Sequence, residues 1–250
     1  MSNALIKGAG YALTGLHWLP KTGLRGFVIV PLLINTVLFS IGIWWSTGQL
    51  ENFDHYLQRH LPSWLHWLHW LLWPLFILAA LVVIFYTFTV VANVIATPFN
   101  SLLAEQVEKR VNPDRTPRPT SNLWWKELAL SPLAELGKLL YFIGWAIPLL
   151  LLSLLSLFIP VIAPALPVLW ALFSAWMLAL QYADYPLSNR GLTFRNQRRL
   201  LRRHWPLTLG FGGMTLVLTL VPVLNFLVMP AAVIGATLLW SQELRPNNPA

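Results

Sequence analysis

Four long stretches of this 250-residue chain contain no Asp, Glu, Lys or Arg: residues 26–50, 60–104, 139–183 and 204–242. They are apolar on all sides and lack the period-two alternation of membrane β-strands. A helix rises about 1.5 Å per residue and needs roughly 20 apolar residues to cross a bilayer. The first stretch therefore predicts one span, and each of the others is long enough for a long helix or a hairpin.

The first two stretches predict two long transmembrane helices. The first span is expected over 26–48, and a charged external loop is expected to follow over 51–60. The second span is expected over 64–98, where Trp residues at every third position indicate an aromatic belt at the outer interface. Pro98 and Asn100 indicate a bend at its end.

The second half of the chain predicts two hairpins separated by a basic segment. Residues 99–138 are charged and interrupted by proline, which indicates a partly helical cytoplasmic region. Prolines also interrupt 139–185, so this stretch is expected to leave and return on the same side. After the basic cytoplasmic segment 186–204, a second hairpin is expected over 205–242 with its turn at 222–225. Its arms, at 204–221 and 223–242, hold 18 and 20 residues, so full crossing and partial penetration both remain open.

Glycines occur in the first 20 residues and again in the last hairpin. Residues 1–20 combine glycines with apolar residues and predict a short amphipathic helix on the membrane surface. The glycines at 210–213 are expected to weaken the first arm of the last hairpin. Ala231 and Gly235 stand four residues apart, a spacing that permits close helix contacts in an oligomer.

Composition supports a membrane class. Of all residues, 56% are hydrophobic and 10% are charged, against roughly 25% charged in an ordinary soluble domain. If the spans alternate, all 17 Lys and Arg residues except Arg59 fall on one side, which predicts cytoplasmic termini. We interpret the basic cluster at 190–203 as an anchor to anionic membrane lipids rather than a nucleic-acid site. The chain has no cysteine, which excludes disulfides and thiol chemistry. The fold class is therefore an all-α membrane protein.

Several separated segments resemble the CysZ family of sulfate permeases. They are GLR at 23–25, FVIVPLLIN at 27–35, ATPFNSLLAEQ at 96–106, FSAWMLA at 173–179 and VPVLN at 221–225. The resemblance implies a transporter in the bacterial inner membrane that takes up sulfate for cysteine biosynthesis. It also implies two long spanning helices, two hairpins that only partly enter the bilayer, and assembly into homo-oligomers.

The candidate sulfate site is the turn Thr22, Gly23, Leu24, Arg25 and Gly26. Sulfate is a dianion without a proton to donate, so its site must supply donors and positive charge. A capped helix start presents free amides, glycine permits close approach of the backbone, and an Arg forms two parallel bonds to two oxygens. The alternative is a capped helix start with an interfacial Arg. The family often carries a second Arg where this chain has Gly26, so the site is either weaker or uses another cation.

Polar residues inside apolar helices are candidates for a transport pathway, because they are costly in lipid. They are Asn35, Asn93, Asn100, Gln181 and Asn225. The alternative for each is a hydrogen bond between helices. Glu105, Glu108 and Arg110 are candidates for proton coupling or gating, against the alternative of a solvated helix end. Asp184 is expected to pair with the arginine cluster that follows it.

No enzyme, metal or cofactor signal stands out. His66 and His69 lie three apart on one predicted helix face, but no carboxylate accompanies them, which favours packing in the aromatic belt. The common hydrolase, metalloprotease and phosphate-loop motifs are absent from the sequence. The competing hypothesis is a membrane scaffold or assembly factor that does not transport and that docks partners on its arginine-rich face.

Overall fold

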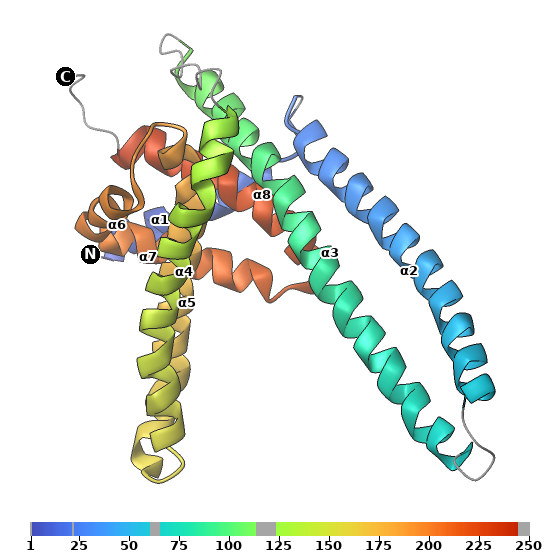
Figure 1. Cartoon of the computed structure of the whole chain (residues 1–250). Coiled ribbons are helices and arrows are strands. Elements are labelled where there is room, and N and C mark those ends of the chain that lie inside the picture. Colours follow the sequence, from blue (N-terminus) through green and yellow to red (C-terminus); the bar gives the residue numbers. More distant parts are fainter. Residues whose placement is uncertain (1, 22, 61–65, 114–123, 245–250) are drawn as a thin grey trace. The chain divides into compact units, whose positions relative to one another are not determined.

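A computed structural model describes residues 2–21, 23–60, 66–113 and 124–244, and these residues form helices without any strand (Figure 1). The chain divides into two compact units. One unit comprises 26–99, and the other comprises 1–25 together with 100–250. The all-α membrane fold expected from the sequence is confirmed. The described residues contain four helical stretches long and apolar enough to cross a membrane, within 70–87, 136–155, 160–188 and 227–244.

The unit of residues 26–99 consists of α2 (Gly26–His60) and most of α3 (His66–Val111). At about 1.5 Å per residue, α2 is about 52 Å long, well beyond the roughly 30 Å of the hydrocarbon core. The expected external loop at 51–60 is wrong, because this stretch continues the helix. Large apolar side chains such as Trp44 and Phe85 are exposed along both helices, as expected for surfaces that face lipid.

Helix α3 continues beyond the expected end of the second span. It includes Pro98 and runs to Val111, for 46 residues in total. Proline removes one backbone donor but does not stop this helix, since the turns on both sides of it remain helical. The last part of α3, from Asn100 onward, belongs to the other unit. The helix ends before Asn112-Pro113, where the sequence indicates a break.

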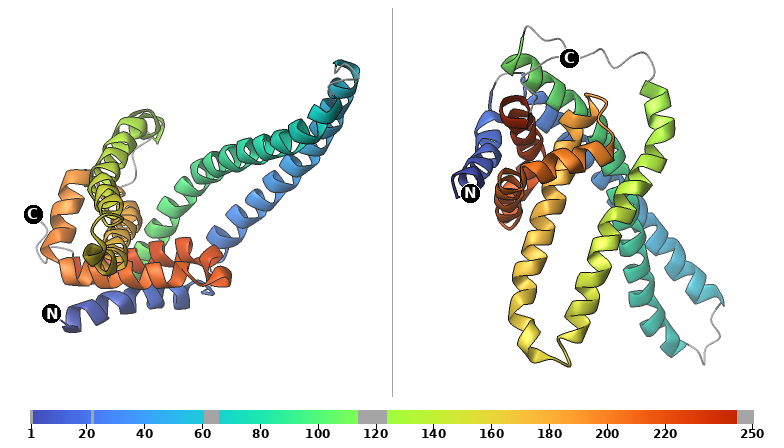
Figure 2. Two further views of the ribbon diagram at one scale, coloured as in Figure 1. Left: turned by 90° about the horizontal axis from the view of Figure 1, so that it is seen from below. Right: turned by 90° about the vertical axis from the view of Figure 1, so that its left-hand side faces the viewer.

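The first hairpin is confirmed, with a longer first arm than expected. Helix α4 (Trp124–Leu155) begins 15 residues before position 139, and α5 (Leu166–Ser188) returns beside it (Figure 2). The short helix η2 (Pro160–Ala165) and the residues before it form the tip. Because Pro160 and Pro164 cannot continue an α-helical hydrogen-bond ladder, the chain reverses there.

The second hairpin follows α6 (Phe194–Arg203) and consists of α7 (Trp205–Thr219) and α8 (Pro222–Leu239). The turn lies at 220–221, slightly before the expected 222–225, because Pro222 opens α8. Helix α7 is about 22 Å long, shorter than the hydrocarbon core. Helix α8 and the following η3 (Trp240–Leu244) are mostly covered by protein, with 72% of the stretch 227–244 buried.

Helix α1 (Ser2–Trp18) packs on both arms of this second hairpin. A Cβ atom on Gly8 would lie 2.0 Å from the carbonyl oxygen of Leu207 in α7. One on Gly15 would lie 2.0 Å from the carbonyl oxygen of Ala231 in α8. The expected surface helix is therefore a helix, but one of its faces is covered by protein.

The small residues of the hairpin serve this packing. A Cβ atom on Gly210 would lie 2.0 Å from the carbonyl oxygen of Leu5, and one on Gly212 would lie 1.8 Å from that of Ala175. Gly210 and Gly212 thus let α7 approach α1 and α5 closely, whereas a Cβ atom on Gly213 would meet nothing within 4 Å. Ala231 and Gly235 are buried against α1, so their spacing is used within the chain rather than for an oligomer contact.

Candidate anion site

The turn between α1 and α2 has a defined geometry. Its backbone amides at Lys21 and Leu24 donate to the carbonyl oxygens of Trp18 and Lys21, at 3.0 and 3.1 Å. Gly23 has φ +82°, a conformation that favours glycine. The Leu24 side chain is fully buried and anchors the turn to the protein. The amide of Leu24 is thus occupied, whereas the first amides of α2, from Gly26 on, have no acceptor within their own helix.

Two cationic side chains of this turn are held close to it. The Arg25 Nε donates to the carbonyl oxygen of Pro20 at 2.5 Å, so the guanidinium lies back on its own turn. The Lys21 ammonium lies over the Trp18 ring, 3.5 Å from its centroid. Both side chains are exposed, and the positive charge is therefore accessible from outside the protein.

A third cation approaches from α3. The Arg110 Nη2 lies so close to Gly23 that a Cβ atom at that position would be 2.6 Å from it. The positive φ favours glycine at this position, whereas the Arg110 guanidinium, as the end of a flexible side chain, could move aside for a Cβ atom. The structure brings together two groups of residues that the sequence left apart, the glycine turn and the charged end of α3. Two guanidinium groups, from Arg25 and Arg110, contact this single turn.

The end of α3 is fixed by burial and by a buried ion pair. Leu103 and Val107 are fully buried on one face of the helix, and the Glu108 side chain is 2% exposed. Glu108 accepts from the Arg190 Nε at 2.9 Å and also from its Nη2. The solvated helix end considered for Glu108 is wrong, since its carboxylate is an internal partner of Arg190. This pairing holds the helix that carries Arg110.

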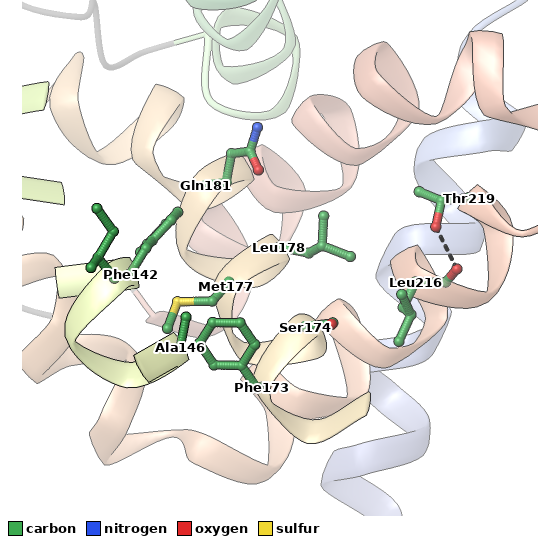
Figure 3. Close-up of a pocket in the computed structure, with 10 residues that line it drawn as sticks. Phe142, Ala146, Phe173, Ser174, Met177, Leu178, Gln181, Leu216 and Thr219 are labelled. Atoms are coloured by element: carbon green, nitrogen blue, oxygen red, sulfur yellow. Dashed lines mark hydrogen bonds between the residues drawn. The ribbon is translucent and has the colours of Figure 1, made fainter. Parts of the chain in front are cut away.

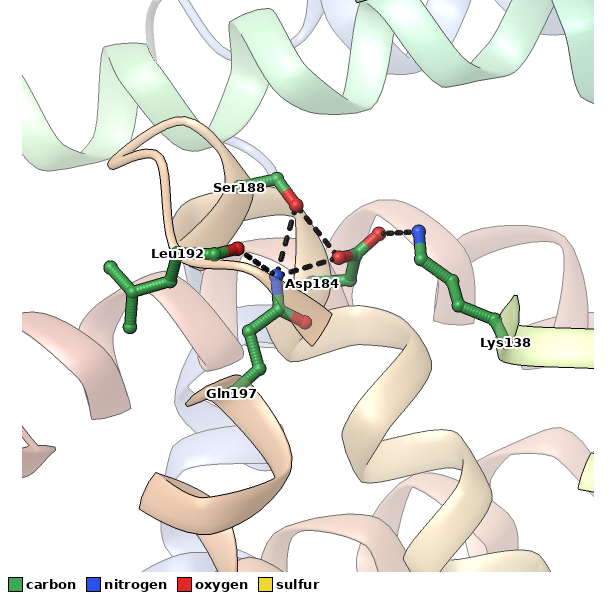
Figure 4. A network of polar contacts seen from close by, with 5 residues as sticks. All are labelled: Lys138, Asp184, Ser188, Leu192 and Gln197. Atoms are coloured by element: carbon green, nitrogen blue, oxygen red, sulfur yellow. Dashed lines mark hydrogen bonds and ion pairs between the residues drawn. The ribbon is translucent and has the colours of Figure 1, made fainter. Parts of the chain in front are cut away.

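Asp184 forms the centre of a second polar network (Figure 4). Its carboxylate lies 2.5 Å from the Lys138 ammonium and accepts from the Ser188 hydroxyl at 2.7 Å. The Gln197 side-chain amide donates to Asp184, to Ser188 and to the carbonyl oxygen of Leu192. The expectation that Asp184 pairs with the arginine cluster is wrong, because Lys138 on the other arm of the hairpin neutralises it.

The other pathway candidates that the structure describes have separate surroundings. Asn100 is buried, and its Nδ2 has no hydrogen-bond partner among the described residues. Glu105 pairs with Lys109 at 2.6 Å on the helix surface. Asn225 is exposed in the first turn of α8. Thr22 and the side chains of Asn35, Asn93, His66 and His69 lie outside the described residues.

A cavity of about 490 Å³ opens between α4, α5 and α7 (Figure 3). Apolar side chains line most of it, with Phe142, Phe173 and Met177 among them. Its polar residues are Ser174, Gln181 and Thr219, and none of its lining residues is charged. A dianion needs several donors and positive charge, and the lining of this cavity offers no positive charge. Gln181, expected on a polar route, lies at an apolar cavity.

Known proteins resemble this chain over most of its length. Residues 11–230 match the family described as sulfate transporter CysZ/etoposide-induced protein 2.4. A sulfate transporter CysZ of Pectobacterium atrosepticum is 44% identical over 239 residues, which are 95% of this chain and 86% of the relative. The protein of the same name from Salmonella typhimurium is 43% identical over 93% of this chain and 91% of its own length. That of Pseudomonas paraeruginosa is 41% identical, with 95% and 96% covered.

Proposed function

The chain belongs to the sulfate transporter CysZ/etoposide-induced protein 2.4 family, and from this premise we propose that it binds sulfate at the turn of Gly23 and carries it through the membrane. One observation supports this site assignment: the guanidinium groups of Arg25 and of Arg110 from α3 both lie against this turn. A transporter without catalytic chemistry needs only donors and charge at such a site.

The groups around the turn suit a tetrahedral dianion. The backbone at Gly23 permits close approach of an anion. Arg25 and Arg110 each supply paired donors that match two oxygens of one sulfate ion. Arg110 takes the role of the second cation that the family often carries at the position of Gly26. Thr22 completes the proposed site.

Binding to purified protein tests this assignment. Arg25→Ala and Arg110→Ala are each expected to weaken sulfate binding by about 10-fold or more, since each removes a charge-assisted pair of donors. Lys109→Ala is the matched control, because it removes one positive charge from the same helix end while its partner is Glu105. Calorimetric titration with sulfate measures the three affinities. Equal affinities in all variants would refute the site.

Flux measurements test transport itself. Proteoliposomes that contain the protein are expected to take up radiolabelled sulfate faster than empty vesicles. A scaffold or assembly factor would give no flux above that of empty vesicles, whatever its affinity for partners. A pH gradient applied across the vesicle membrane distinguishes proton-coupled from channel-like uptake. Glu105 and Glu108 are the candidate groups for proton coupling.

The proposal also covers the membrane, the orientation and the oligomeric state in which the protein acts. We place the protein in the bacterial inner membrane with both termini in the cytoplasm, where imported sulfate supplies cysteine biosynthesis. The positive-inside distribution of Lys and Arg supports this orientation. The 15-residue length of α7 and the burial of α8 support a second hairpin that enters the bilayer without crossing it. Homo-oligomers in contact with membrane lipids complete the proposal, and molar-mass measurement of the detergent-solubilised protein tests it.

A further inference from the structure

Helix α6 has two faces of opposite character. Gln197 and Leu201 are buried, and they fix the helix to the protein. Four arginines at 195, 199, 202 and 203 lie on its other side. At 100° per residue, these four positions fall within an arc of about 100°, on the side opposite Gln197 and Leu201. We call Arg195, Arg199, Arg202 and Arg203 the arginine face.

The charges of the arginine face are not neutralised within the described part of the chain. None of its four guanidinium groups forms an ion pair with a described carboxylate, in contrast to Arg190, which pairs with Glu108. Helix α6 itself contains no Asp or Glu. Four like charges on three turns of helix repel one another and favour an anionic partner.

Helix α6 lies between the two hairpins along the chain. Helix α5 ends at Ser188 and α7 begins at Trp205, so α6 connects the end of the first hairpin to the start of the second. A connection of this length keeps the helix near the base of both hairpins. Trp205 is 43% exposed at the start of α7, as is typical of an interfacial aromatic residue.

A fifth arginine at the edge of this surface is held by aromatic rings. The Arg198 guanidinium lies 4.4 Å from the centroid of Tyr141 in α4 and 5.0 Å from that of Phe194. Its Nε is buried and has no hydrogen-bond partner among the described residues. Stacking of this kind fixes the plane of a guanidinium without using its outer donors. Nearby on α4, Leu140 is 61% exposed and offers an apolar surface for acyl chains.

From these observations we propose that the arginine face, together with Arg198, binds the phosphodiester headgroups of anionic phospholipids. The phosphates pair with the guanidinium donors, and the acyl chains run along the apolar surface of the α4–α5 hairpin. This binding anchors the base of both hairpins at a fixed depth in the membrane. It is independent of sulfate binding, since Arg25 and Arg110 lie outside α6.

Thermal unfolding of the full-length protein in an uncharged detergent and a sulfate-free buffer tests the proposal. Short-chain phosphatidylglycerol or phosphatidylcholine is added at equal mole fraction, at about 0.1 M salt so that screening is moderate. Phosphatidylglycerol is expected to raise Tm above the value with phosphatidylcholine, because a ligand that binds only the folded state stabilises it. Arg199→Gln/Arg202→Gln is expected to reduce this difference by roughly half or more.

The matched control removes two positive charges elsewhere. Arg59→Gln/Lys109→Gln is expected to keep the full difference in Tm between the two lipids. A second double variant, Arg195→Gln/Arg203→Gln, repeats the test on other positions of the same face. The proposal is overturned if the two lipids shift the wild-type Tm equally, or if both α6 variants keep the full difference. It is also overturned if inorganic phosphate alone reproduces the shift, because the site then binds free anions.

Discussion

Glu108 and Arg190 are 82 residues apart in the sequence and form an ion pair in which the glutamate side chain is 2% exposed. The pair joins the end of α3 to the loop that follows α5. Beside it, the Asn189 side chain donates to the carbonyl oxygen of Ser101 at 2.8 Å. These two contacts hold the helix that carries Arg110, the second cation of the proposed sulfate site. The position of Arg110 therefore depends on the carboxylate of Glu108, two residues before it.

Removal of the buried carboxylate is expected to destabilise the protein. Glu108→Gln leaves the Arg190 guanidinium without its counter-charge, and breaking a buried pair of this kind typically costs about 3 kcal/mol or somewhat less where one partner is partly exposed. Sulfate affinity is expected to fall as well, because the end of α3 loses its fixed position. Chemical unfolding in detergent and sulfate titration measure the two effects.

Glu105→Gln is the matched control for this experiment. Glu105 lies one turn earlier on the same helix and pairs with Lys109 at the surface, where such a pair contributes about 0.5 kcal/mol. The same chemical change is therefore expected to leave stability almost unaltered. Equal losses of unfolding free energy in Glu108→Gln and Glu105→Gln would show that burial of Glu108 does not determine its contribution to stability.

Gly23→Ala is expected to weaken sulfate binding. The alanine Cβ would meet the Arg110 guanidinium at 2.6 Å, and φ +82° is unfavourable for alanine by about 1 kcal/mol or more. Strain in the turn, together with a shift of the Arg110 guanidinium, would disturb the proposed set of donors. Gly144→Ala is the control, since a Cβ atom added to this residue in the exposed part of α4 would meet nothing within 4 Å. Titration with sulfate compares the two variants, and unchanged affinity in Gly23→Ala would contradict the role of Arg110.

Ionisation of the Tyr11 phenol makes the stability of the folded protein depend on pH in the alkaline range. Burial, with a hydrogen bond to Glu243 at 2.8 Å, raises the pKa of Tyr11 above its ordinary value of 10.0. The folded state therefore favours the neutral phenol, and this contribution is complete below pH 10 and lost as the pH rises above it. Tyr11→Phe is expected to be less stable than wild type by about 1 kcal/mol near neutral pH, with a difference that shrinks above pH 10. Unfolding measured from about pH 8 to 11 checks this, and a constant difference would contradict it.

The spans and hairpins could be predicted because their signals are local. An uncharged apolar stretch predicts a membrane helix wherever it occurs, and Pro160 with Pro164 predicts the reversal at the hairpin tip. The error at 51–60 has a local cause as well, since charged residues indicate where a membrane span ends but not where a helix ends. The backbone hydrogen bonds of α2 continue through these charged residues to His60.

The partners of the charged side chains could not be predicted, because they depend on contacts distant in sequence. Asp184 lies close in sequence to a cluster of arginines, yet its partner is Lys138, 46 residues earlier. The turn at Gly23 was identified from its own residues, whereas the approach of Arg110 depends on the packing of α3 by Leu103 and Val107. An apolar face shows that a helix packs, but not which partner it packs against.

The packing of α1 on the second hairpin is expected to be sensitive to a single methyl group at Gly15. A Cβ there would lie 2.0 Å from the Ala231 carbonyl oxygen and 2.7 Å from the Gly235 nitrogen, both backbone atoms that cannot move aside without shifting α8. Gly15→Ala is therefore expected to cost about 2 kcal/mol of unfolding free energy by overpacking. Gly10→Ala in the same helix meets no atom within 4 Å and is expected to be neutral or stabilising by up to about 1 kcal/mol, since alanine has the higher helix propensity. Chemical unfolding of both variants in detergent measures the difference, and a Gly15→Ala protein as stable as Gly10→Ala would show that α1 does not pack on α8 in this way.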